Sequence, residues 1–182
     1  QSIHGRKSRQ ATQGQREKWQ PPDDGWIKAN VDGALSKVGE MGGAGVVFRN
    51  QEGAFLGGSC HAFPRCKDSA RAELYACRRA AQLAAELNVQ NLHIEMDCRE
   101  IVCKLRSKEK DLSELGPIIE EVKQLLTSRE RWKITWVSRS ANVAAHRLAR
   151  HGVANNLCKV WLNEPPECIL QVVSDKIPSW EI

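Results

Sequence analysis

Apolar and polar residues recur along the chain with two different periods, and the changes between them predict the order of strands and helices. Alternation at every second residue is typical of a strand, whereas apolar residues spaced three and four apart are typical of a helix. Strands are expected at residues 26–34, 43–49, 54–62, 91–97 and 132–137. Helices are expected at residues 69–87, at 98–106, from Gly116 onward and from Asn142 onward. The order is therefore three strands, a helix, a strand, two helices, a strand and a final helix.

The lengths of the connections predict how these strands pair. The first three strands follow one another through short turns, such as residues 50–53, which favours an antiparallel meander. The last two strands are reached through helices, and a helical crossover joins parallel strands. We expect an α/β fold with a mixed five-stranded sheet, in which a three-stranded antiparallel meander is joined by two parallel strands and flanked by helices.

The same pattern sets the domain boundaries. Residues 1–24 are rich in Gln, Arg, Lys and Ser, which predicts a disordered basic linker. Its basic residues fit either a solvated tail or a weak phosphate-binding arm. Residues 25–155 carry the periodic elements and form the folded domain. Residues 156–182 are expected to be a tail that packs back onto the domain, because it contains Trp161 and an apolar run at 169–173.

Composition narrows the class of protein. The chain has 182 residues, of which 41% are hydrophobic, and a formal net charge of +5, which fits a polyanionic partner. Its 7 cysteines include no C-x-x-C pair, which argues against a zinc site and favours free thiols in a reducing compartment. Without a long apolar span or a secretory leader, we expect an intracellular protein, nuclear or cytoplasmic, with no membrane partner. The first residue, Gln1, indicates a piece excised from a longer polypeptide.

Three acidic residues are the candidates for chemistry. Asp32 ends the apolar run of the first strand, Glu73 sits in the first turn of the alanine-rich helix, and Asp97 closes the strand at 91–97. Each also has an ordinary structural explanation. Asp32 before Gly33 can simply form a turn, Glu73 can favour a helix start through the helix dipole, and Asp97 can cap the next helix.

Together the three carboxylates indicate a metal site. If the strands at 26–34 and 91–97 are parallel neighbours, Asp32 and Asp97 lie side by side at one edge of the sheet, where ligands bind in open α/β sheets. The crossover helix can bring Glu73 to the same place. Hard cations such as Mg²⁺ prefer oxygen ligands, and a pair of them can drive attack on a phosphodiester. Glu95 is expected to support the site or face solvent and not to bind metal.

Four segments in this order resemble the type 1 ribonuclease H family. They are Asn30-Val-Asp32-Gly33-Ala34, Ala72-Glu73-Leu74, Glu95-Met-Asp97-Cys98, and the stretch from Arg139 through Asn142 and His146 to Ala149. The chain is most similar to the plant ribonuclease H-like domain found at the end of non-LTR retrotransposon polyproteins and in genes derived from them. The resemblance covers about residues 26–173, and Trp161-Leu-Asn-Glu-Pro-Pro also resembles the plant group.

The resemblance implies an activity and a set of ligands. It implies cleavage of the RNA strand of RNA–DNA hybrids with two Mg²⁺ ions, for which Mn²⁺ can substitute, and a reverse transcriptase domain in the same parent polypeptide. Asp32 would bridge both metals, and Glu73 and Asp97 would complete their coordination. Contacts to 2′-hydroxyls and phosphates would select the hybrid. The candidates for these contacts are Ser36, Gly42, Ser69 and Arg71.

The chain departs from the family pattern at its fourth acidic position. His146 stands where the family has Asp, and many plant relatives also carry His at this position. Imidazole is a poorer ligand for Mg²⁺ than carboxylate. His146 could act on a bound water or shuttle a proton as a catalytic residue, or it could mark a site whose activity is reduced or lost. The histidine loop and the basic handle helix of bacterial relatives are also missing.

The alternatives to a nuclease of this family are a binding module with the same fold and another nuclease of that fold, such as a transposase or exonuclease core.

Overall fold

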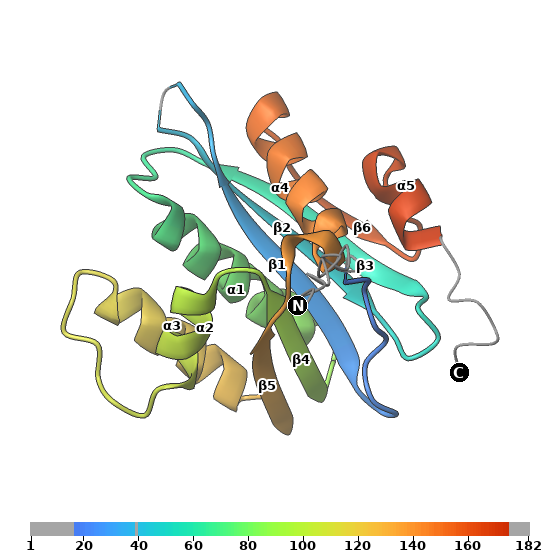
Figure 1. The fold of residues 1–182 in the computed structure, drawn as a ribbon, viewed down its shortest axis with the longest axis horizontal. Coiled ribbons are helices and arrows are strands. Elements are labelled where there is room, and N and C mark those ends of the chain that lie inside the picture. The colour runs from blue at the N-terminus through green and yellow to red at the C-terminus, as the bar shows by residue number, and fades with distance from the viewer. Residues whose placement is uncertain (1–16, 39, 175–182) are drawn as a thin grey trace, which may run out of the picture.

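Six strands form one sheet in the computed structural model, which describes residues 17–38 and 40–174 (Figure 1). The strands are β1 (Ile27–Leu35), β2 (Gly42–Arg49), β3 (Phe55–Phe63), β4 (Asn91–Met96), β5 (Arg131–Trp136) and β6 (Cys158–Leu162). The helices are α1 (Ser69–Glu86), α2 (Arg99–Arg106), α3 (Gly116–Thr127), the 3₁₀ turn η1 (Arg139–Ala141), α4 (Val143–Asn155) and α5 (Glu167–Ser174).

The sheet has the order β5-β4-β1-β2-β3-β6. β1, β2 and β3 pair antiparallel, whereas β4 lies parallel to both β1 and β5. The expected α/β architecture, with a meander joined by two parallel strands, is therefore confirmed. The sheet has one strand more than the five we expected, because β6 pairs antiparallel with β3. β6 was not recognised in the sequence because its residues are mostly exposed and do not alternate.

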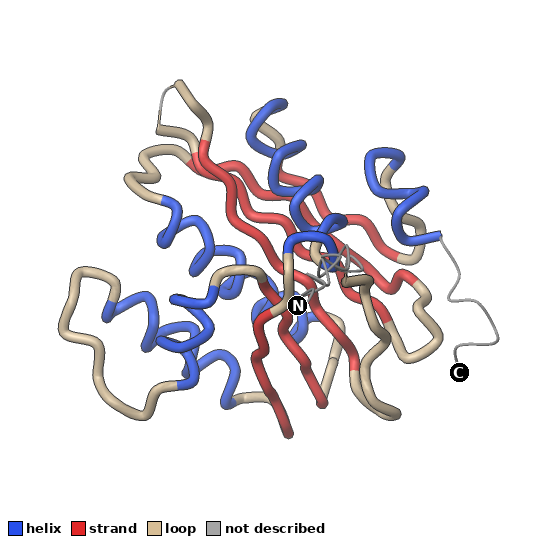
Figure 2. Tube along the Cα trace, viewed as in Figure 1, coloured by secondary structure: helices blue, strands red, loops and turns tan. Residues whose placement is uncertain are grey.

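Helices cover both faces of the sheet and bury two separate cores. On one face, α1, α2 and α3 pack against alternate residues of the central strands, including Val31, Ile94 and Met96. On the other face, α4 and α5 enclose a smaller core around Leu148 and Ile169. In Figures 1 and 2, α2 and α3 lie beside β4 and β5, whereas α4 and α5 lie over the part of the sheet formed by β2, β3 and β6. The sheet is therefore held between two layers of helices.

The segments outside the periodic elements are partly described. Residues 17–24 were expected to be disordered, but they lie against the sheet, because Trp19 and Pro22 have apolar surface to bury. The rest of the expected linker, residues 1–16, lies outside the described residues. In the C-terminal segment, β6 extends the sheet and α5 packs on α4 with Ile169 fully buried; residues 175–182 are not described. Within residues 17–38 and 40–174, every helix falls short of the length and apolar character needed to cross a bilayer.

Candidate active site

Asp32 lies in the middle of β1 and not at its end. β1 continues to Leu35 in register with β2, so Asp32-Gly33 does not form a turn. The neighbouring strand β4 stops earlier, and its register pairs Asn30 with Glu95. Counting two residues on along both parallel strands places Asp32 level with Asp97, just beyond the last pairing. The predicted meeting of these two carboxylates at the edge of the parallel strands is therefore found, although β4 alone ends there.

Glu73 reaches the same place because α1 approaches β1 very closely. It lies in the second turn of α1, not in the first as expected, since Asp68 caps the helix by accepting a hydrogen bond from the Arg71 amide at 2.8 Å. A Cβ built on Gly33 would lie 2.4 Å from the Glu73 backbone nitrogen. The missing side chain of Gly33 thus lets the helix backbone rest on the strand. The Gly33 amide donates a hydrogen bond to Glu73 Oε2 at 3.1 Å, which orients this carboxylate.

The three carboxylates form one compact cluster. One oxygen from each of Asp32, Glu73 and Asp97 lies within 4.8 Å of the others. Asp32 is 1% exposed and Glu73 is 7% exposed. Among the described residues, nothing donates a hydrogen bond to the buried Asp32 Oδ1. A buried carboxylate oxygen without a partner is costly, and hard oxygen ligands suit Mg²⁺. The cluster therefore fits a divalent cation.

Burial and mutual repulsion raise the pKa values of two of these acids, Asp32 and Glu73. Burial, followed by the repulsion of Asp97, raises the pKa of Asp32 from 3.8 to about 6, against the hydrogen bond from His146 that lowers it. Burial, followed by the repulsion of Asp32 and Asp97, raises the pKa of Glu73 from 4.5 to about 9. Both effects disfavour the charged form. A bound divalent cation would remove this penalty and would displace the proton that Glu73 otherwise holds at neutral pH.

We expect the metal-free protein to lose stability as the pH rises from about 4 to about 9, the window set by the pKa values of Asp32 and Glu73. Because both folded-state pKa values are raised, the native state binds more protons than the unfolded state in this window, and stability falls as the groups ionise. Urea unfolding at several pH values in EDTA measures this slope. Excess Mg²⁺ should flatten it, and a slope of zero or of opposite sign in EDTA would contradict the expected repulsion.

His146 lies on the cluster from the opposite side. It projects from α4, whose close approach to the sheet depends on Gly45, where a Cβ would lie 2.2 Å from the Ala145 carbonyl oxygen. His146 Nδ1 is 2.7 Å from Asp32 Oδ2. The histidine is about one-third exposed, so it lies between the buried carboxylate and solvent. Its predicted place beside the three acids is therefore found, with a direct contact to Asp32.

Arg139 is a member of the site that the sequence analysis did not assign. Its guanidinium forms an ion pair and hydrogen bond with Asp97 Oδ2, and the hydrogen bond raises the pKa of Arg139. Its Nη1 also lies 3.3 Å from His146 Nδ1. A single Nδ1 cannot donate to Asp32 and accept from Arg139 at once, so the proton on this atom decides which contact is a hydrogen bond. The feature of the sequence that could have indicated Arg139 was the short link from Val137 to Asn142. A link this short has few side chains that can lie over the acids.

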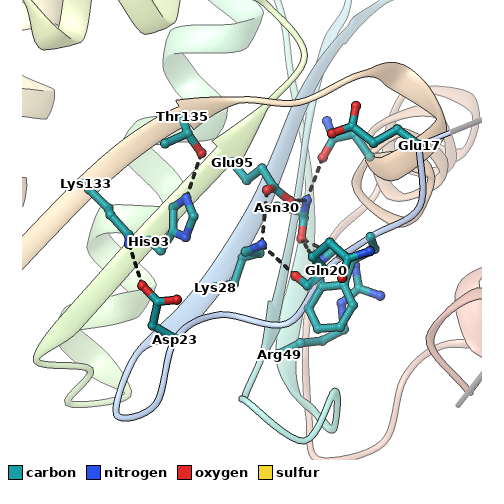
Figure 3. Close-up of polar contacts among 12 residues, drawn as sticks. Glu17, Gln20, Asp23, Lys28, Asn30, Arg49, His93, Glu95, Lys133 and Thr135 are labelled. Atoms are coloured by element: carbon teal, nitrogen blue, oxygen red, sulfur yellow. Dashed lines mark hydrogen bonds and ion pairs between the residues drawn. The ribbon is translucent and has the colours of Figure 1, made fainter. Parts of the chain in front are cut away.

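Glu95 is buried away from the acidic cluster. Glu95 lies two residues before Asp97 and faces the same side of the sheet. Its Oε1 accepts from Lys28 Nζ at 3.1 Å and its Oε2 accepts from Asn30 Nδ2 at 2.9 Å (Figure 3). Glu95 is only 7% exposed, so it does not face solvent. Its two oxygens are occupied by protein donors, and it stays a prediction that Glu95 supports the site and binds no metal.

The four expected nucleic-acid contacts differ in accessibility. Ser69 is exposed at the start of α1, and Ser36 is half-buried after β1. Arg71 lies two residues before Glu73 on α1 and forms an ion pair with Glu114 at 3.2 Å. Gly42 is buried, and a Cβ built there would meet the Phe63 ring at 2.2 Å. Ser69 and the half-buried Ser36 therefore remain accessible for contact, whereas the Arg71 side chain is mostly covered and paired with Glu114. Burial argues against a direct contact from Gly42.

Solved structures show the same fold. Ribonuclease H1 from Halobacterium salinarum aligns with a TM-score of 0.66 and 22% identity over 72% of this chain and 99% of its own. The N-terminal ribonuclease H domain of Rv2228c from Mycobacterium tuberculosis aligns with a TM-score of 0.64 and 22% identity over 71% of this chain and 94% of that chain. LC11-RNase H1, isolated from compost and solved in complex with an RNA/DNA hybrid, aligns with a TM-score of 0.64 and 19% identity over 71% of this chain and 98% of that chain. The expected ribonuclease H-like fold is therefore confirmed.

Sequence comparisons place the chain in a family. The chain is 30% identical over 139 residues to "Putative ribonuclease H protein At1g65750" of Arabidopsis thaliana, which covers 76% of this chain but only 22% of that relative's length. The family model described as "Reverse transcriptase-like" matches residues 30–152, a span that includes all three acids and His146. The chain therefore belongs to the reverse transcriptase-like family and carries a ribonuclease H-like domain of the plant type.

Proposed function

We propose that this domain is an endoribonuclease that cleaves the RNA strand of RNA–DNA hybrids by two-metal-ion hydrolysis. The observation that carries the proposal is the convergence of Asp32, Glu73 and Asp97, with ligand atoms within 4.8 Å of one another, in a chain of the ribonuclease H-like family. The structural neighbour LC11-RNase H1 was solved with an RNA/DNA hybrid, which supports a hybrid as the substrate here.

The three carboxylates would hold Mg²⁺, or Mn²⁺ in its place. Asp32 is central, because its two oxygens face different neighbours: Oδ2 is held by His146, and Oδ1 has no partner among the described residues. Glu73 is fixed by the Gly33 amide, and Asp97 extends from the end of β4. Bound metal ions would supply Lewis acid stabilisation of the phosphate and of the attacking and leaving oxygens.

Two basic side chains can assist the reaction. Arg139 is 60% exposed beside Asp97, so its guanidinium can neutralise a substrate phosphate at the mouth of the cluster. His146 reaches Asp32 through Nδ1 at 2.7 Å and is partly open to solvent. An imidazole is a common general acid or base, because it can both accept and donate a proton. We therefore propose His146 as a catalytic residue that moves a proton, not as a metal ligand.

The proposal is tested by incubating the chain with a labelled hybrid and Mg²⁺ or Mn²⁺. Cleavage of the RNA strand should require the metal and should disappear in Asp32→Asn, because that variant removes the central carboxylate. Single-stranded RNA and duplex DNA serve as substrate controls. Tight binding of the hybrid without cleavage in either metal would contradict the proposal.

That outcome would support a second function, a binding module whose catalysis is weakened. The observation that favours it is the pair of basic side chains on the acids: His146 replaces a carboxylate, and Arg139 already pairs with Asp97. Both reduce the negative charge available to a second cation. The activity of the first candidate would be reduced for the same reason.

We expect His146→Asp to raise the Mg²⁺-supported cleavage rate by about three- to tenfold and to lower the Mg²⁺ concentration needed for half-maximal rate. The new carboxylate adds an oxygen ligand beside Asp32, and it can take over the proton transfer proposed for the imidazole. Rates measured over a Mg²⁺ titration check this result. His151→Asp adds the same charge farther along α4, near Trp161, and should leave the rate unchanged. An unchanged or lower rate in His146→Asp would show that the imidazole does not limit metal binding.

The cellular setting is also a proposal. The Arabidopsis relative is much longer than this chain, and a reverse transcriptase domain in the same parent polypeptide would supply hybrids as its product. All seven cysteines are free thiols, which fits an intracellular location, nuclear or cytoplasmic. Co-purification of the cleavage activity with a reverse transcriptase domain in the full-length polypeptide would support this setting.

A further inference from the structure

A short segment before β1 lies across the face of the sheet beside the candidate site. Glu17–Gln20, which we call the N-terminal strap, covers polar residues at the start of β1 and the end of β2 (Figure 3). The Trp19 ring lies 4.0 Å from the Arg49 guanidinium carbon, and its Nε1 donates to Asn30 Oδ1 at 2.8 Å. Lys28 Nζ donates to the Gln20 carbonyl oxygen at 2.6 Å. The strap is therefore fixed by side chains of the sheet.

The strap also contacts the loop that carries Arg139. This loop, Ser138–Asn142, connects β5 to α4 and contains the turn η1. The Ser140 hydroxyl donates to the Glu17 carbonyl oxygen at 2.7 Å, and the Ser138 amide donates to Glu17 Oε2 at 3.3 Å. Arg139 lies between these two anchored serines and reaches Asp97. The strap thus holds the loop on both sides of the arginine.

A second route runs from the strap through the buried face of the sheet. Asn30 accepts from Trp19 and donates through Nδ2 to Asn142 Oδ1 at 3.1 Å. Asn142 Nδ2 in turn donates to the Val31 carbonyl oxygen at 2.9 Å, next to Asp32. Asn142 also precedes α4, and its carbonyl oxygen accepts from the His146 amide at 3.1 Å. Both asparagines are fully buried. A displacement of Trp19 is therefore passed through their hydrogen bonds to the start of α4, which carries His146.

The Trp19 contact persists at neutral pH because Arg49 stays charged. Burial, opposed by the charge of Glu95, lowers the pKa of Arg49 to about 10, which still leaves the guanidinium protonated at pH 7. A desolvated cation over an indole face is attracted by the negative face of the ring. Gly53 borders the same ring, with a built Cβ 3.6 Å from the indole. The indole therefore packs in one defined position against β1, β2 and the turn that follows β2.

We propose that the N-terminal strap is a positioning element of the acidic site. Glu17 and Trp19 hold the loop Ser138–Asn142 so that Arg139 reaches Asp97 and His146 reaches Asp32, although neither strap residue touches the acids. The proposal rests on the proposed nuclease function for its catalytic consequence. A displacement of about 1 Å of a group at a reacting centre can change a rate by up to about a hundredfold. Loss of the strap should therefore affect turnover more than substrate affinity.

The test uses the full 182-residue chain with Glu17→Ala and Trp19→Ala. Each variant should lower kcat for hybrid cleavage about tenfold while KM stays within about twofold. Amide exchange at Asn142 and His146 should become about tenfold faster, because the loop and the start of α4 open more often. Glu17→Gln keeps an acceptor oxygen for Ser138 and should retain the wild-type kcat.

Trp26→Ala is the matched control. Trp26 is another half-buried tryptophan in contact with basic groups, with Lys133 Nζ 4.6 Å from its ring, but it has no link to the loop among the described contacts. It should leave kcat and the exchange of Asn142 and His146 unchanged. Unchanged kcat and exchange in both alanine variants, or equal effects in Trp26→Ala, would overturn the proposal. If the wild-type chain does not cleave hybrids, the proposed function fails, and the exchange rates alone still decide the role of the strap: faster exchange in the strap variants supports it, and unchanged exchange overturns it.

Discussion

The Asp32→Asn variant is expected to be inactive and yet more stable than the wild-type protein when metal is absent. The loss of activity, by roughly 10³-fold or more, follows from removal of the carboxylate that both proposed metal ions need. The gain in stability follows from burial. Ionised Asp32 is 1% exposed beside Asp97, and its pKa is raised from 3.8 to about 6. Folding therefore works against the charge, and this shift corresponds to about 3 kcal/mol above pH 6.

The difference in stability between Asp32→Asn and wild type should depend on pH. At pH 4 folded Asp32 is protonated and unfolded Asp32 is only partly ionised, so the variant and wild type should differ little in their free energies of unfolding. The difference should grow as the pH rises through about 6 and reach about 2 kcal/mol, because asparagine keeps an oxygen that can accept from His146 but leaves its own amide group poorly solvated. Urea unfolding in EDTA at pH 4 and pH 8 measures the difference.

Metal should reverse the order of stability. Excess Mg²⁺ stabilises a protein that binds it in the folded state only, so wild type should gain and Asp32→Asn should not. Asp24→Asn, which changes an exposed aspartate, is the control for charge alone and should behave like wild type in both conditions. An Asp32→Asn variant that is less stable than wild type at pH 8 in EDTA would refute the idea that the acidic cluster is held together at a cost.

Much of the fold followed from the periodicity of the sequence. The strand of alternating residues around Val31 and the apolar residues of β4 face the helices α1 to α3, and the polar residues between them face the other side. Because of this alternation, the sequence alone was enough to predict that Asp32 and Asp97 are neighbours. Glu73 could also be predicted to join these two acids, because α1 connects the meander to β4 and must pass over β1.

Other features depend on tertiary contacts that leave little trace in the sequence. β6 is a strand only because β3 offers it an unpaired edge, and four of its five residues are exposed. The N-terminal strap lies in a stretch of polar composition, and Trp19 alone marks it as a segment with something to bury. The direction of the Arg139 side chain depends on the path of the loop Ser138–Asn142, which periodicity does not describe. Each of these features lies in a segment without a repeating pattern.

Gly33→Ala is expected to destabilise the protein by about 3 kcal/mol or more and to separate Glu73 from Asp32. The new Cβ would lie 2.4 Å from two backbone atoms of α1, the Ala72 carbonyl carbon and the Glu73 nitrogen. Backbone atoms cannot move aside as the end of a flexible side chain can, so the helix must shift away from β1. Overpacking of this kind costs about 1–3 kcal/mol or more, and the shift also breaks the hydrogen bond from the Gly33 amide to Glu73 Oε2 at 3.1 Å.

The effect on metal binding should exceed the effect expected from stability alone. A shift of about 1 Å in α1 moves Glu73 away from the other two carboxylates and weakens the coordination of a cation by all three. We expect the Mg²⁺-induced rise in melting temperature to fall by more than half, even in conditions where the variant remains folded. Gly57→Ala is the matched control, because Gly57 also lies in a strand and its built Cβ approaches nothing closer than 3.3 Å. Gly57→Ala should keep the Mg²⁺ response, whereas a Gly33→Ala protein with a full response would show that the close approach of α1 does not set the geometry of the acids.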